Sequence, residues 1–134
     1  MIRSIFAVVA GFVAITILSI GMDALLQRIA PGVFKAGERL YTAPVLLSII
    51  IYVQLFVAVG CYVAAKVAGR RPMVHALALG ALGFISSIGG TIAYWNTAPA
   101  WYHILSLGLI LPAAWLGGYW RQRQVDKTSV QPLG

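Results

Sequence analysis

Long stretches without a charged residue constrain this chain more than any other feature. Residues 4–22, 40–65 and 72–120 contain no Asp, Glu, Lys or Arg. A helix needs about 20 apolar residues to cross the hydrocarbon core of a bilayer. The first two stretches therefore predict one transmembrane helix each. The third would be roughly 74 Å long as a single helix, so it must turn back on itself.

The turn in the third stretch is predicted at residues 96–99, Asn-Thr-Ala-Pro, the only polar, helix-breaking cluster in it. Proline suits the first turn of a helix, and Asn or Thr suits the capping positions before it. We therefore expect four transmembrane helices, at about residues 4–26, 42–67, 73–94 and 99–120. Short connections favour an all-α, up-down-up-down bundle over residues 1–121. The polar tail, 122–134, is predicted to be disordered.

The basic residues predict how this bundle lies in the membrane. Only 10% of the residues are charged, too few to cover a soluble domain, and the net charge is +7. Most basic residues fall on one side if the helices alternate in direction, which predicts cytoplasmic termini. Attraction to lipid headgroups accounts for the charge without any nucleic acid. The residues expected to contact headgroups or a partner are Arg70, Arg71, Arg121 and Arg123.

Small residues recur along one face of the third predicted helix, at alternating steps of four and three. Helices in lipid associate through close packing of small side chains, because lipid is as apolar as leucine. The pattern predicts a tight bundle with little lumen, and it suits packing against other membrane subunits or a second copy. The predicted packing face comprises Ala76, Gly80, Gly83, Ser87 and Gly90, with Gly11 and Ala58 on the first and second helices.

Few polar side chains lie within the predicted helices. Gln54 falls roughly 18 Å into the second helix, near the bilayer midplane, and its amide needs partners there. Thr16, Ser19, Ser86 and Ser87 on the first and third helices are the expected partners. A ligand-binding role for Gln54 is the alternative.

Two ionisable residues, Asp23 and His103, fall near the outer ends of the first and fourth helices. Either they contact each other across the bundle, or both reach headgroup water, where the cost of a charge is small. Together with Gln54 and Asn96 they form the possible polar intramembrane site.

Aromatic residues crowd around the predicted turn: Tyr94, Trp95, Trp101 and Tyr102, followed by His103. Tyr and Trp collect at the headgroup level because each has an apolar body and a polar edge. This favours an interfacial belt, with a second belt of Tyr62, Trp115, Tyr119 and Trp120 at the other surface. A pocket in which the rings converge on a ligand is the alternative.

Motifs for catalysis or cofactor binding are missing from the sequence. It contains no zinc spacing, phosphate-binding loop or nucleophile elbow, and one cysteine, Cys61, excludes a disulfide framework. Three acidic residues leave little acid–base chemistry. His75 and His103 are expected on opposite sides of the membrane, so they cannot share one haem. We therefore expect no enzyme, no cofactor and no metal.

Two segments resemble small uncharacterised bacterial inner-membrane proteins: GCYVAAKVAGRRPMVHALALG at residues 60–80 and LPAAWLGGYWR at 111–121. The resemblance implies a four-helix topology and a bacterial cytoplasmic membrane, and it brings no activity with it.

Two functions are compatible with these features. The first is a non-enzymatic membrane protein that acts through helix packing, as an accessory or assembly subunit of a membrane complex or as a homo-oligomer. The alternative is a small transporter or channel for a lipophilic or cationic solute. It would use Gln54, Asp23 and His103, together with the kink expected at Pro112 in the fourth helix.

The predicted orientation can be measured with reporter fusions. A reporter joined after Gly134 should behave as cytoplasmic, and one inserted near Gly37 as periplasmic, because the basic residues favour cytoplasmic termini. Activity of the two reporters in cells is the measurement. The opposite pair of signals would show that the charge argument is wrong.

Overall fold

The computed structural model describes residues 1–32 and 42–130, and this part of the chain is entirely helical apart from its turns. Each of its four long helices is long and apolar enough to span a membrane. The sequence prediction of an all-α chain with four such helices is therefore confirmed. The elements are α1 (Ile2–Ile29), α2 (Ala43–Ala68), α3 (Pro72–Ala93), the 3-10 turn η1 (Trp95–Thr97) and α4 (Ala100–Val130).

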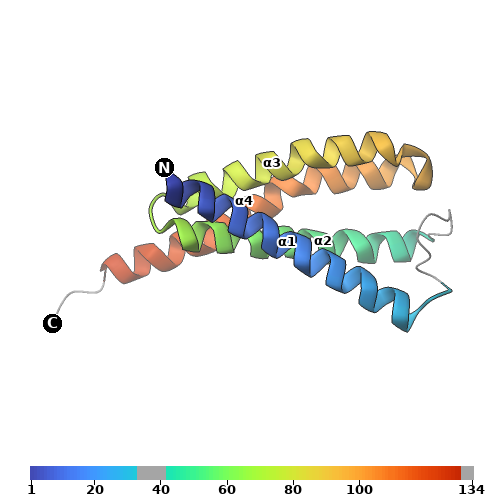
Figure 1. The fold of residues 1–134 in the computed structure, drawn as a ribbon, viewed down its shortest axis with the longest axis horizontal. Helices are drawn as coiled ribbons and strands as arrows, with labels where there is room; N and C mark the ends of the chain where they lie inside the picture. Colours follow the sequence, from blue (N-terminus) through green and yellow to red (C-terminus); the bar gives the residue numbers. More distant parts are fainter. Residues whose placement is uncertain (33–41, 131–134) are drawn as a thin grey trace.

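The helices run back and forth along the long axis of the molecule (Figure 1). We call the end at which α1 begins and α2 ends the basic end, and the end with the α3–α4 turn the hairpin end. α2 packs against all three other long helices, and α3 packs extensively against α4. Around the bundle the order is therefore α1, α2, α4, α3, with α1 and α4 at opposite corners.

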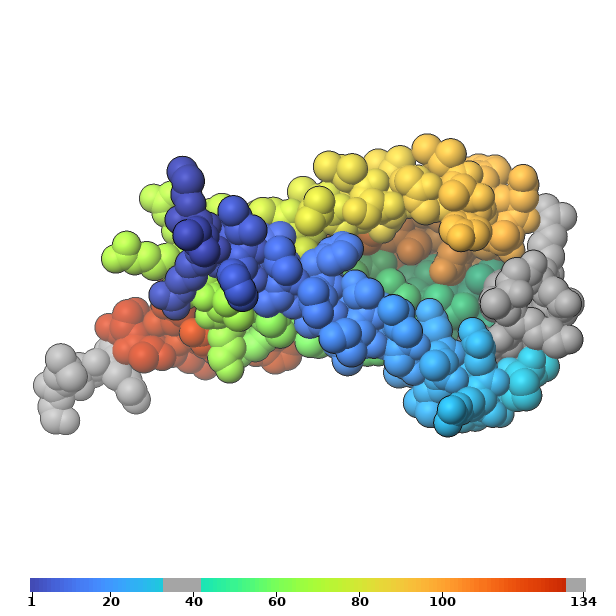
Figure 2. Space-filling view, in the orientation of Figure 1, coloured from blue at the N-terminus to red at the C-terminus, as the bar shows by residue number. Residues whose placement is uncertain are grey.

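The edge between α1 and α3 is the least closely packed of the four. A β-carbon placed on Gly11 of α1 would lie 2.5 Å from Leu79 of α3, so the two helices meet there. Towards the hairpin end they separate, and Figure 2 shows a hollow between them with α2 and α4 behind it. The bundle is therefore closed at one end and open to the side at the other.

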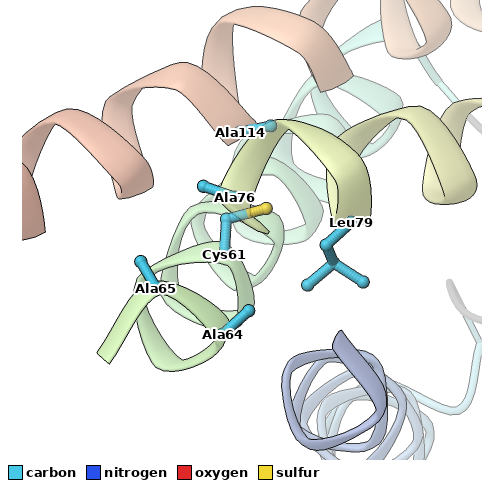
Figure 3. Packing of buried hydrophobic residues seen from close by; sticks show 6 residues of the cluster. All are labelled: Cys61, Ala64, Ala65, Ala76, Leu79 and Ala114. Carbon is cyan, nitrogen blue, oxygen red and sulfur yellow. The ribbon is translucent and has the colours of Figure 1, made fainter. Parts of the chain in front are cut away.

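The buried core sits where the helices are closest, in the half of the bundle near the basic end. It consists of small side chains and one leucine (Figure 3): Cys61, Ala64, Ala65, Ala76, Leu79 and Ala114. Glycines let the backbones approach. A β-carbon on Gly60 would meet Ile15 and the carbonyl of Gly11, and one on Gly117 would meet the carbonyl of Ala58. Close van der Waals contact between backbones is the main attraction available to helices in lipid.

Other helices of the chain cover the small-residue face of α3 over only about half of its length. Gly80 packs against Ala114 of α4, as the sequence pattern suggests. A β-carbon on Gly83 or Gly90, further along α3, would have no atom within 4 Å apart from its own helix. The predicted continuous packing face is therefore buried within the chain near the basic end and uncovered towards the hairpin end.

The turn between α2 and α3 is tight and holds two residues with positive φ, Gly69 at 71° and Arg71 at 48°. The Nε of Arg3 donates a hydrogen bond of 3.2 Å to the carbonyl of Val67, in the last turn of α2. Carbonyls at a helix C-terminus lack partners and carry partial negative charge, so a guanidinium is favourable there. Arg3 thereby fastens the start of α1 to the end of α2.

α4 is longer than the sequence analysis predicted. The expected disordered tail began at residue 122, whereas the helix continues to Val130. Hydrogen bonds between neighbouring turns, such as Gln122 Nε2 to Asp126 Oδ1 at 3.1 Å, support this extension. The first helix breaker after Trp120 is Pro132, and residues 131–134 lie outside the described part. At about 46 Å, α4 exceeds the roughly 30 Å hydrocarbon core.

The close approach of α1 and α2 predicts a difference between two glycines. Gly60→Ala should lower the free energy of unfolding by about 1–3 kcal/mol, because its methyl group meets Ile15 and a backbone carbonyl. Gly108→Ala is the control, since a β-carbon there has no neighbour within 4 Å. It should be neutral or stabilise by up to about 1 kcal/mol, because alanine favours the helix. Denaturation in detergent micelles measures both, and effects of equal sign would contradict the packing.

Candidate functional site

The polar residues predicted inside the membrane lie at separate places in the structure. Gln54 is half-buried on α2, and its Nε2 donates a 2.9 Å hydrogen bond to the backbone carbonyl of Ser106 on α4. Its Oε1 is buried without a hydrogen-bond partner among the described residues. The expectation of a partner on the first or third helix was wrong. Gln54 faces α4, and the hydroxyl of Thr16 bonds to the carbonyl of Phe12 in its own helix.

Asp23 accepts a hydrogen bond of 2.7 Å at Oδ1 from the hydroxyl of Tyr52 on α2. This bond joins α1 to α2 in the half of the bundle nearer the hairpin end. The proposed contact between Asp23 and His103 required α1 and α4 to be neighbours. They occupy opposite corners of the bundle, and the rings of Trp95 and Tyr102, near the same turn, contact His103.

His103 lies under the α3–α4 turn. Only 6% of its surface is exposed, so it does not reach into headgroup water as the second alternative proposed. Its ring stacks on that of Trp95, with 5.3 Å between centroids and 16° between planes, and meets Tyr102 edge-on at 5.5 Å. Its Nε2 is buried and has no hydrogen-bond partner within residues 1–32 and 42–130. The turn brings Trp95 back over the first turn of α4 and covers the imidazole.

Three aromatic side chains near the turn are exposed, whereas Tyr102 is half-buried. Tyr94 is 65% exposed, Trp95 49% and Trp101 40%, and Asn96 is exposed beside them. Trp95 also covers the ring of His103, and Trp101 meets Tyr102 edge-on with 6.5 Å between centroids. This arrangement supports the interfacial belt over a pocket of converging rings.

A second group of exposed rings lies towards the other end of the bundle. Trp115 and Tyr119 stack with centroids 4.9 Å apart, and the guanidinium carbon of Arg123 lies 5.9 Å from the Tyr119 centroid. Trp120 is also exposed there. Aromatic groups near both ends, separated by apolar helix, are what a bilayer favours.

A cavity of about 250 Å³ lies between the four helices, at the hollow between α1 and α3. Apolar side chains form most of its wall, and the polar contribution comes from Ser86, Ser87 and Ser106. We call it the α1/α3 cleft, defined by Phe12, Ile15, Gly83 and these three serines. The small-residue pattern predicted little lumen, and this space was not expected from the sequence. The available signal was the cluster of serines on the third and fourth helices.

The serine hydroxyls of the α1/α3 cleft differ from the hydroxyls of Thr16 and Ser48. Thr16 and Ser48 donate hydrogen bonds to carbonyls one turn back in their own helices. In the described part of the chain, the hydroxyls of Ser86, Ser87 and Ser106 make no hydrogen bond. Hydroxyls in hydrocarbon without partners are costly, so these three groups are available to a partner that enters the cleft.

The basic residues predicted to meet headgroups or a partner all lie at the basic end. Arg70 is exposed in the α2–α3 turn, and the carbonyl of Arg71 lies 3.0 Å from Nδ1 of His75. Arg121 is half-buried, and its Nη1 donates a 3.3 Å hydrogen bond to Oε1 of Gln124. The guanidinium of Arg123 is exposed over Tyr119.

Within residues 1–32 and 42–130, no three His, Cys, Asp or Glu side chains are placed to hold a metal ion together.

No protein-family model matches the chain, and no curated protein or solved structure shows significant similarity to it.

The bond from Gln54 to α4 predicts a measurable loss of stability. Gln54→Met keeps the length of the side chain and removes the donor, so it should lower the free energy of unfolding by about 0.6–2 kcal/mol. Thr16→Val is the matched control, because its hydroxyl bonds only to its own helix. Chemical denaturation in micelles compares the two. An unchanged stability in Gln54→Met would show that the bond contributes little.

Proposed function

We propose that this chain is a non-enzymatic integral membrane protein that acts through helix packing, as an accessory or assembly subunit of a membrane complex or as a homo-oligomer. The α1/α3 cleft is the observation that carries this proposal. It combines a small-residue face that no helix of the described chain covers with hydroxyl groups that have no partner. These are the two kinds of group through which helices associate in lipid.

The geometry of α3 suits a helix from another subunit. Gly83, Ser87 and Gly90 follow one another at steps of four and three, so they lie on one side of α3. At these three positions α3 carries no side chain larger than serine, so a helix packed on this side can approach the α3 backbone closely. Ser86 and Ser87 then gain hydrogen-bond partners that lipid tails do not provide.

The membrane setting of this proposal rests on charge. The basic end carries Arg3, Lys66, Arg70, Arg71, Arg121, Arg123 and Lys127. We infer an up-down-up-down topology with this end in the cytoplasm, following the preference of basic residues for that side. The resemblance of residues 60–80 and 111–121 to small bacterial inner-membrane proteins supports the same membrane.

Crosslinking from single cysteines tests the association. The native Cys61 is first replaced by alanine, which suits a site among Ala64 and Ala65. Ser87→Cys then places a thiol in the α1/α3 cleft, and Gly89→Cys places one about 200° away around α3. With a short thiol-specific crosslinker in native membranes, Ser87→Cys should give a larger species, either a dimer or a complex with another subunit. Gly89→Cys should give much less.

Two outcomes would overturn the proposal. One is a protein that stays monomeric from both positions and also runs as a monomer in mild detergent. The other is equal crosslinking from both sides of α3, which would indicate random collision in the membrane rather than a defined interface. Mass spectrometry of the larger species distinguishes a homo-oligomer from a complex with another protein.

The α1/α3 cleft also favours a second candidate function, a small transporter for a lipophilic solute. Ser106 lines this cleft with Ser86 and Ser87, and its carbonyl accepts the hydrogen bond from Gln54, so the cleft borders a residue bonded to that mid-helix amide. Flux of lipophilic cations and neutral amphiphiles into liposomes tests this, with Gln54→Leu as the variant. Flux that depends on the protein and falls in the variant would favour transport over the packing role.

A further inference from the structure

A second apolar depression lies on the opposite side of the bundle from the α1/α3 cleft. α2 and α4 run side by side in the same direction (Figure 1), and two hollows of about 300 and 360 Å³ lie between them. The hollows share Leu55, Ala58 and Leu116, so they form one continuous depression, which we call the α2/α4 groove. The small side chain of Ala58 leaves space along this depression, whereas Gly117 brings the α4 backbone against the carbonyl of Ala58.

The length of the α2/α4 groove matches one leaflet of a bilayer. It extends along α2 from Ile50 to Tyr62, which is about 18 Å at the helical rise. Half of the hydrocarbon core is about 15 Å thick. Its walls are apolar except for Gln54 in the middle and Tyr62 and Gln124 at the basic end. An acyl chain therefore fits along it.

Three cationic side chains lie at the basic end of the α2/α4 groove. Lys66 follows Tyr62 by four residues, which continues the groove side of α2 by one turn. On α4, Arg123 follows Leu116 by seven residues and Lys127 follows Trp120 by seven, so both continue the groove side of α4. All three side chains are exposed.

The cations lie close to the level at which the groove meets the membrane surface. The hydroxyl of Tyr62 donates a 2.8 Å hydrogen bond to Oε1 of Gln124, which fixes α2 and α4 in register there. Lys66 and Arg123 each lie within one turn of this bond. Lys66 and Lys127 make no ion pair or hydrogen bond with another described residue. Asp126, the carboxylate nearest in sequence, accepts a hydrogen bond from Gln122.

We propose that the α2/α4 groove binds one anionic phospholipid. An acyl chain lies along Leu55, Ala58 and Leu116, and the phosphate meets Lys66, Arg123 and Lys127 at the basic end. Charge complementarity selects this occupant: lysines and arginines beside a membrane surface attract anionic lipids, whereas a zwitterionic headgroup brings no net charge. A second copy on this face, in the same orientation, would bring another basic end beside the first, and like charges repel.

Fluorescence quenching tests the site directly, because Trp120 lines the groove. The other tryptophans are replaced in one variant, Trp95→Phe, Trp101→Phe and Trp115→Phe, so that emission reports from Trp120 alone. The full chain is reconstituted in phosphatidylcholine vesicles with increasing fractions of phosphatidylglycerol brominated on its acyl chains. Brominated phosphatidylcholine is the comparison. Brominated phosphatidylglycerol should quench Trp120 at a clearly lower mole fraction.

Two double variants with the same change of charge separate the site from general attraction to the basic end. Lys66→Gln with Arg123→Gln removes two cations from the groove, and Arg70→Gln with Arg71→Gln removes two from the α2–α3 turn. The preference should fall about fivefold for each groove cation neutralised, the factor corresponding to about 1 kcal/mol. Screening by salt should keep the loss in the turn variant below about twofold.

A third variant tests the apolar part of the groove. Ala58→Leu fills it without changing any charge and should weaken the phosphatidylglycerol preference, while circular dichroism confirms that the helices remain. Equal quenching by the two lipids would overturn the proposal. So would equal losses in the two double variants, because these would indicate attraction of anionic lipid to the basic end as a whole.

Discussion

The close approach of α2 to its neighbours is the contact on which the rest of the bundle depends. Helices surrounded by lipid gain little from burying apolar side chains, so they hold together where their backbones touch. Gly60 brings α2 to α1 and Gly117 brings α4 to α2, each against a backbone carbonyl. α2 also packs against α3, so it is in contact with all three other helices.

This packing divides the molecule into two halves of different character. Near the basic end, alanines and Leu79 fill the space between helices, and Arg3 caps α2. Towards the hairpin end, α1 and α3 diverge, and individual polar bonds such as that from Tyr52 to Asp23 join the helices. Regions with few buried contacts open most readily. The open half is therefore also the half suited to receiving a further helix.

The number and type of the helices could be predicted because the bilayer fixes the length of an apolar span, and the break at residues 96–99 followed from its composition. The choice of neighbours could not. Each helix carries small residues that suit several partners, so Gln54 was assigned to the wrong helices and the burial of His103 beneath Trp95 was missed. The extension of α4 beyond Trp120 could have been predicted from the sequence, since no helix breaker lies between Trp120 and Pro132.

A hydrogen bond joins a residue of the α2/α4 groove to a residue of the α1/α3 cleft. Gln54 lines the α2/α4 groove, and its amide donates to the carbonyl of Ser106, a residue that lines the α1/α3 cleft. The buried Oε1 of Gln54 has no partner among the described residues, so this oxygen can still accept a hydrogen bond. A partner helix in the cleft would thus lie against Ser106, and a lipid in the groove would lie against Gln54, its hydrogen-bond partner. If filling one side shifts that pair, linkage requires the two binding free energies to change by the same amount.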